Sequence, residues 1–226
     1  MLVPYRSISR SLLALIAAGL LALLAGCGGG SSSSTSVSAP SPPSTATTAS
    51  TKSTTAKPSC GSSTAAASSE AGSTAQGDIP DNQQFLTFKN RSAGYTSSYP
   101  QGWARSGNGD QVTFQDKSNT ITIKVAPGPR PTPASVTAEL KQEAATDPCL
   151  HAGSPQSTSA GANQVVKVTY TTEGQKSPVT GQRPKITVDR YVYFKGGKVA
   201  TVDLATPVGV DNVDAYRMIS ESFRWS

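Results

Sequence analysis

The chain has 226 residues, a formal net charge of +6 and one histidine. Its positive charge is mild and lacks the basic cluster typical of nucleic-acid-binding proteins, so we expect no nucleic-acid partner. The sequence also lacks the nucleophile motifs of hydrolases and any phosphate-cradling loop, and it offers only one histidine as a catalytic base. We therefore expect that the protein is not an enzyme.

The first 26 residues have the pattern of an export signal. Arg6 and Arg10 precede an apolar run, residues 12–24, which would be about 20 Å long as a helix and too short to span a bilayer comfortably. The run ends at Leu24-Ala25-Gly26-Cys27, which resembles the bacterial lipobox. That resemblance implies cleavage before Cys27, acylation of its thiol, and anchoring in the lipid bilayer at the outer face of the cell membrane. The alternative is an ordinary signal peptide or short anchor with an incidental cysteine.

Residues 27–78 have the composition of a linker. Ser and Thr make up 25 of the 51 residues from 28 to 78, and there is no aromatic residue among them. Such a segment buries too little apolar surface to offset its ordering entropy, so we expect a disordered spacer with a root-mean-square reach of roughly 40 Å. The expected folded domain, residues 79–226, carries a net charge of +4, because 16 Lys and Arg face 12 Asp and Glu.

Two cysteines remain once Cys27 is assigned to lipidation. In an oxidising compartment, an even pair favours a disulfide between Cys60 and Cys149, which would pin the linker to the domain. The alternative is two free or intermolecularly paired thiols. The only histidine, His151, lies two residues from Cys149 without a carboxylate cluster, so we expect no metal site and no cofactor.

The domain begins with strands. Short extended runs lie around residues 85–88 and 95–99, and alternating apolar residues mark strands over 112–116 and 120–126, joined by a turn of hairpin length. Thr132-Pro133 reads as the cap and first position of a helix that continues to about residue 145, with Val136, Leu140 and Ala144 on its apolar face. We expect a loop over residues 148–163.

Three long strands follow, over residues 164–172, 185–195 and 198–206, with Gly196-Gly197 as a two-residue hairpin turn. Asp211 is the expected cap of a final helix. Its expected buried side chains are Val213, Tyr216, Ile219 and Phe223. This element order predicts an α+β fold in which an antiparallel sheet is flanked by helices.

Several short motifs resemble the PsbP-like (Mog1/PsbP) family and the LpqN-type lipoproteins of actinobacteria. They are Gly94-Tyr95, Tyr99-Pro100-Gln101-Gly102-Trp103, Val125-Ala126-Pro127 and Ser222-Phe223-Arg224. The resemblance covers residues 85–226 and implies an antiparallel sheet with helices and a non-catalytic accessory or binding role. No metal-binding motif of the family carries over. Trp103 is expected in the core, and the alternative is a ring that stacks on a ligand.

Alternation along the long strands suggests a recognition surface. Lys124, Lys167, Tyr191 and Tyr193 fall on the polar side of the expected sheet, and rigid aromatic rings beside charges are typical of binding surfaces. The alternatives are that Thr and Tyr simply suit solvated strands, or that another segment covers this face. Arg190 falls among apolar residues, where we expect a bulge or an edge position to turn it outward rather than a buried, paired arginine.

These features predict a membrane-anchored lipoprotein of the cell envelope whose domain, with no catalytic residues, binds a protein or another envelope component. A carrier of a small apolar or lipid ligand is the alternative, and a hydrolase without a recognisable motif is a third hypothesis.

Overall fold

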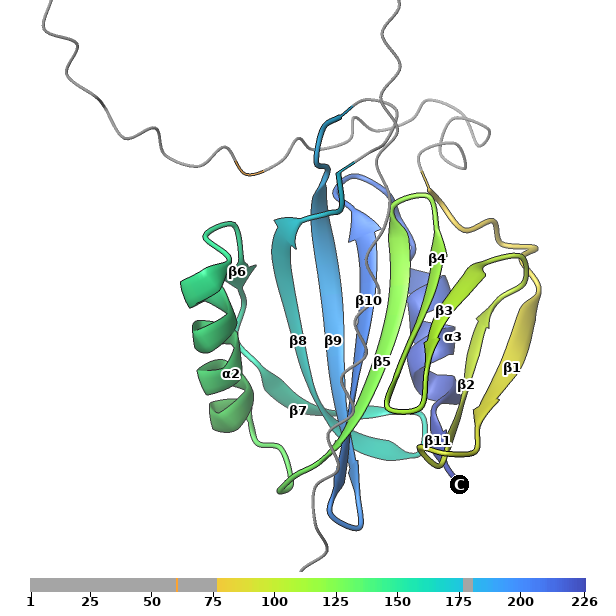
Figure 1. The fold of residues 1–226 in the computed structure, drawn as a ribbon, viewed down its shortest axis with the longest axis vertical. Coiled ribbons are helices and arrows are strands. Elements are labelled where there is room, and N and C mark those ends of the chain that lie inside the picture. The colour runs from red at the N-terminus through yellow and green to blue at the C-terminus, as the bar shows by residue number, and fades with distance from the viewer. Residues whose placement is uncertain (1–59, 61–76, 177–180) are drawn as a thin grey trace, which may run out of the picture. The chain divides into compact units, whose positions relative to one another are not determined.

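The computed structural model describes residues 60, 77–176 and 181–226. The expected signal peptide, Cys27 and the expected linker up to residue 76, apart from Cys60, lie outside the described residues. The described part contains eleven strands and two helices (Figure 1). No helix within it is long and apolar enough to cross a membrane.

The larger sheet has eight antiparallel strands in the order β3-β4-β5-β10-β9-β8-β6, and β7 also pairs with β8. Its strands are β3 (Ala104–Asn108), β4 (Gln111–Asp116), β5 (Asn119–Pro127), β6 (His151–Ala152), β7 (Gln156–Ala160), β8 (Asn163–Glu173), β9 (Lys185–Lys195) and β10 (Lys198–Pro207). The β9–β10 hairpin turns at Gly196 and Gly197, whose φ angles of 56° and 79° are the left-handed values that a type I′ turn requires. The predicted glycine hairpin is therefore confirmed.

A smaller sheet has three antiparallel strands in the order β1-β2-β11, which are β1 (Phe85–Asn90), β2 (Tyr95–Pro100) and β11 (Arg224–Trp225). The last strand of the chain therefore pairs with the hairpin formed by its first two strands. Phe223, which immediately precedes β11, is fully buried and stacks on Tyr95 and Tyr193. This aromatic stack joins the smaller sheet to the larger one.

Helix α2 (Pro133–Thr146) begins where the sequence predicts. Thr132 Oγ1 accepts from the Ser135 N–H (3.1 Å), and Ser135 Oγ accepts from the Thr132 N–H (3.0 Å), so each residue satisfies a backbone donor of the other. The helix buries Val136 and Leu140 against β8 and β9.

Helix α3 (Val213–Ser222) differs from the prediction at its start. Its N-cap is Asn212, whereas Asp211 Oδ1 accepts from the Val213 N–H (3.1 Å). Val213 is 72% exposed and not part of the buried face, which consists of Ala215, Tyr216, Ile219 and Ser220. Tyr216, Ile219 and Phe223 are buried as expected, but in the first turn Asn212 and Ala215 are the buried residues in place of Val213.

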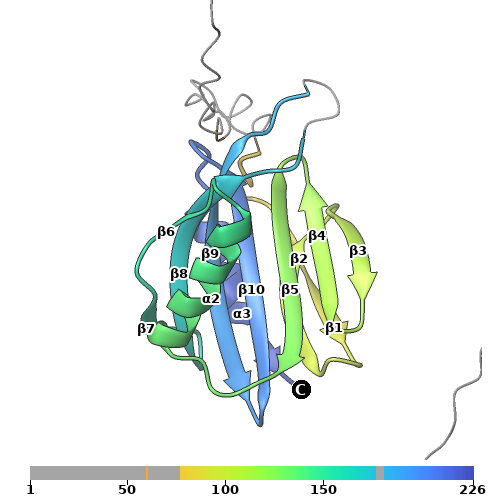
Figure 2. The same cartoon turned by 60° about the vertical axis from the view of Figure 1, so that its left-hand side comes forward.

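The two faces of the larger sheet are covered by different elements. Helix α2 packs on one face at β8 and β9, and α3 and the smaller sheet pack on the other (Figures 1 and 2). Each face therefore has its own apolar core. Residues 148–163, expected as a loop, instead contain β6 and β7, which pair with β8. The fold is α+β with an antiparallel sheet and flanking helices, as predicted.

Candidate functional site

The predicted recognition surface is not an open face, and its prediction is wrong for the two tyrosines. Tyr193 is 0% exposed and its hydroxyl donates to the Ser220 carbonyl (2.7 Å) at the C-terminal end of α3. Burial raises the pKa of Tyr193 well above its usual value of 10.0. Tyr191 is also buried in the same core. Both tyrosines belong to the apolar core that also contains α3 residues, so they serve packing.

The two lysines of that predicted surface are separated by the sheet. Lys167 pairs across the strands with Tyr191, and its Nζ lies 5.0 Å from the Tyr191 ring centroid and 3.1 Å from Asp189 Oδ2. Burial lowers the pKa of Lys167, but its contacts with Tyr191 and Asp189 outweigh burial and raise that pKa overall. Lys124 is exposed on the opposite face, in register with Thr201. The structure thus brings Lys167 and Tyr191 together and leaves Lys124 apart.

Arg190 is a buried, paired arginine, and the expected bulge or edge position is wrong. Its guanidinium binds Asp203 through two hydrogen bonds, Nε to Oδ1 (2.8 Å) and Nη2 to Oδ2 (2.9 Å). Its Nη1 reaches Glu143 of α2 (2.7 Å) and its Nη2 reaches the Tyr170 hydroxyl (3.2 Å). Burial lowers the pKa of Arg190, but its carboxylate partners outweigh burial and raise that pKa overall. The cluster fastens α2 to β9 and β10, so no bulge is needed.

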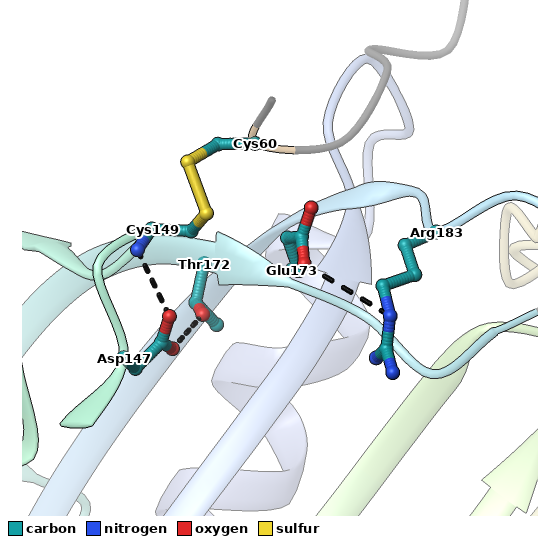
Figure 3. The surroundings of a disulfide bond; sticks show 6 residues. All are labelled: Cys60, Asp147, Cys149, Thr172, Glu173 and Arg183. Atoms are coloured by element: carbon teal, nitrogen blue, oxygen red, sulfur yellow. Dashed lines mark hydrogen bonds and ion pairs between the residues drawn. A yellow bond between two sulfur atoms is a disulfide. The ribbon is translucent and has the colours of Figure 1, made fainter. Parts of the chain in front are cut away.

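Cys60 and Cys149 form a disulfide that joins residues 89 positions apart, with their Cα atoms separated by 5.3 Å (Figure 3). Around it, the Cys149 N–H donates to Asp147 Oδ1 (2.9 Å), and the Thr172 hydroxyl donates to the other oxygen of Asp147. The end of α2 is therefore fixed to the end of β8 at the point where Cys60 attaches.

A buried polar network holds the first residues of the domain, which begin at Gly77. The Gly77 carbonyl accepts from Asn119 Nδ2 and from Asn212 Nδ2 (3.2 Å), and the Ile79 N–H donates to Asn212 Oδ1 (2.8 Å). Asn212 Nδ2 also donates to Thr206 Oγ1 (2.8 Å). These residues lie where β5 begins and β10 ends, the same end of the larger sheet that holds Cys149 (Figure 1). We call it the tether end.

A groove of about 250 Å³ lies at the tether end between residues 78–81 and the start of α3. We call it the acidic groove, because four carboxylates and no lysine or arginine line it. The carboxylates belong to Asp78, Asp81, Asp211 and Asp214. Its apolar lining includes Ile79, Phe85, Val213, Ala215 and Met218.

The sequence reasoning missed this groove. Its signal is two Asp-x-x-Asp segments, Asp78-Ile79-Pro80-Asp81 and Asp211-Asn212-Val213-Asp214, which lie far apart in the chain. The hydrogen bond between Ile79 and Asn212 joins these segments in the folded domain, and neither segment alone predicts the other.

The described residues offer few groups in the arrangement of a catalytic or metal site. His151 is exposed on β6 opposite Thr171. Within the described ranges, no group of three or more His, Cys, Asp or Glu side chains has a geometry suited to a metal ion. Trp103 lies in the core, where the sequence placed it.

No protein-family model and no curated protein matches the chain. The domain is similar to the solution structure of cyanobacterial PsbP (CyanoP) from Synechocystis sp. PCC 6803, at 17% identity and a TM-score of 0.47, over 66% of this chain and 98% of that one. It is also similar to a protein from Bacteroides thetaiotaomicron VPI-5482 whose crystal structure is known, at 13% identity and a TM-score of 0.43. That match covers 62% of this chain and 48% of the other, so the chain spans about half the length of that protein. A PsbP structure is thus among the structures to which this domain is similar, and at these identities and TM-scores the likeness carries no conclusion about function.

Proposed function

We propose that the protein is a membrane-anchored lipoprotein outside the cytoplasm, whose α+β domain binds a protein or another envelope component without catalysing a reaction. The observation that supports this proposal best is how the N-terminal segment meets the domain. Cys60 and Gly77 are both held at the tether end, one by a disulfide and one by buried hydrogen bonds. A chain anchored at Cys27 would then hold its domain by one defined end, with the rest of the N-terminal segment as a spacer.

Labelling with a palmitate analogue in a bacterial host tests the anchor. We expect the wild-type chain to take up the label and to partition with membranes, and Cys27→Ala to do neither. The matched control is the double variant Cys60→Ala/Cys149→Ala, which removes the other two cysteines and should label like wild type. Equal labelling of wild type and Cys27→Ala would contradict a lipid on Cys27.

Crosslinking on intact cells, followed by purification from solubilised membranes, tests the binding role. We expect a defined crosslinked species that is depleted when the domain is deleted and the lipidated linker is kept. Recovery of the bare chain alone, at every crosslinker length tried, would count against a partner-binding role.

A second candidate, a carrier of a small apolar ligand, is favoured by one observation. A groove of about 240 Å³ lies between α2 and β6, with Leu140, Ala144, Leu150 and Ala152 in its lining and Lys141 beside them. Concave apolar sites with a few polar groups are typical of small-molecule binding. Native mass spectrometry of the purified domain distinguishes the two functions, because a carrier retains a copurifying ligand mass and a partner-binding domain has its bare mass.

A further inference from the structure

We propose that the acidic groove docks a basic segment of a partner protein, in which a lysine or arginine lies beside an aliphatic side chain. This inference rests on the proposed binding function and names the chemistry of the partner. Three properties of the groove support it: its charge, its exposed apolar side chains and its rigidity.

The charge of the groove is opposite to that of the domain around it. The residues from 79 onward carry a net +4, yet three of their carboxylates, Asp81, Asp211 and Asp214, gather in this groove beside Asp78, without a lysine or arginine in its lining. Asp214 pairs with Arg217 Nη2 (3.2 Å), but both side chains are largely exposed, so water and salt screen that pair. A cationic side chain therefore gains attraction here, whereas an anionic membrane surface or a nucleic acid is repelled.

The groove also exposes apolar surface that the fold does not use. Val213 is 72% exposed and Met218 is 46% exposed, and these are two of the three large exposed apolar side chains in the described residues. Exposed apolar surface edged by polar groups marks interaction sites, and methionine adapts its shape to a partner. The aliphatic stem of a lysine or arginine suits such a surface, because it packs on apolar groups while its charged end reaches the carboxylates.

The two walls of the groove are fixed to one another before any partner arrives. The Ile79 N–H donates to Asn212 Oδ1, and Asn212 in turn binds Gly77 and Thr206, all within the described core. Asn212 is buried, so this network is protected from water. A preformed groove loses little conformational entropy on binding, which favours a short segment as occupant.

The test uses the chain from residue 28 onward with its disulfide intact, and short peptides as probes. The peptides share a Val/Gly framework and carry lysine, glutamine or glutamate at the same positions. Two-dimensional amide NMR locates each peptide and measures its affinity. We expect the lysine peptide to shift the resonances of residues 78–81 and of the start of α3, and to bind more weakly at higher salt, because salt screens exposed charges.

Charge reversal supplies the matched controls. Asp81→Lys/Asp214→Lys changes two exposed groove residues, and Asp110→Lys/Glu139→Lys makes the same change in net charge at exposed positions outside the groove. We expect the first variant to bind the lysine peptide at least about tenfold more weakly, because like charges repel, and the second to bind it nearly as wild type does. The glutamate peptide should bind the groove variant better than it binds wild type.

Three results would overturn the proposal. They are equal loss of binding in the groove variant and its control, lysine-peptide shifts that lie outside the groove or are absent, and self-association of the wild-type chain that the groove variant abolishes. The last result would assign the groove to a second copy of this chain. Palmitate labelling and crosslinking of the wild-type chain report an anchor and a partner whichever surface binds it, so failure of this inference is distinguishable from failure of the proposed function.

Discussion

Replacing Asp203 by asparagine tests whether the Arg190 cluster fastens α2 to the sheet. The substitution keeps the shape of the side chain, removes its charge and replaces one oxygen acceptor by an NH₂ group that cannot accept a hydrogen bond. Arg190 then keeps only Glu143 as a charged partner, and the Glu143 side chain is 42% exposed.

The size of the effect follows from the burial of each partner. Removing one member of a fully buried ion pair costs about 3–5 kcal/mol, because the remaining charge stays buried without its partner. The Asp203 side chain is 22% exposed, so partial hydration reduces this cost, and we expect Asp203→Asn to lower the free energy of unfolding by about 2–3 kcal/mol. The more exposed Glu143→Gln should cost less than about 1 kcal/mol, since water screens an exposed pair.

Urea unfolding of the oxidised chain, followed by tryptophan fluorescence, measures both values by linear extrapolation. The double variant Arg190→Met/Asp203→Asn is the decisive control. It removes the stranded charge as well as its partner, so it should be more stable than Asp203→Asn alone. Equal costs for Asp203→Asn and Glu143→Gln, or a double variant less stable than Asp203→Asn, would refute this account of the cluster.

The disulfide, the buried tyrosines and the α2 cap yield three further predictions. Replacing Cys60 and Cys149 by alanine should lower the free energy of unfolding by up to about 4–5 kcal/mol in urea, from the chain entropy of the loop, and a cost near zero would mean that the bridge only positions the tether. Burial raises the pKa of Tyr193 and Tyr216 above 10.0, so the folded state holds more protons than the unfolded state above that pH. Stability should therefore fall as pH rises above about 10, with absorbance at 295 nm showing these tyrosines ionising only on unfolding; full ionisation of the folded chain at that pH would contradict their burial. Thr132→Ala should cost about 1 kcal/mol in the same urea assay, whereas Thr146→Ala at the other end of α2 should cost much less.

Local chemistry explains why some elements could be predicted. The glycine hairpin at 196–197 and the start of α2 at Thr132 depend on residues next to one another in the sequence. Both predictions are confirmed by the structure. The start of α3 was less predictable. Asp211 and Asn212 are both typical cap residues, and the Asn212 side chain makes no cap bond because it binds Thr206 and the distant Gly77 carbonyl instead.

The sequence alone could not predict which residues share a face of the sheet. Alternation separates two sets of residues within a strand, but only the pairing register decides which sets of neighbouring strands share a face. Val166 pairs with Val192 and faces α2, whereas Val202 pairs with Tyr191 and faces α3. The apolar sets of β8 and β10 therefore lie on opposite faces, and Tyr191 and Tyr193 are buried rather than open.

By itself, the sequence determined the α+β class, the glycine hairpin and the helix cap, because each depends on neighbouring residues and on a period of two or 3.6. It also placed the expected anchor at Cys27 and the expected spacer after it, from a local motif and from composition. The tertiary structure alone decided the pairing of Arg190 with Asp203, the burial of both tyrosines, and the meeting of residues 78–81 with the start of α3 in one acidic groove. These depend on contacts between distant segments, which no local period encodes.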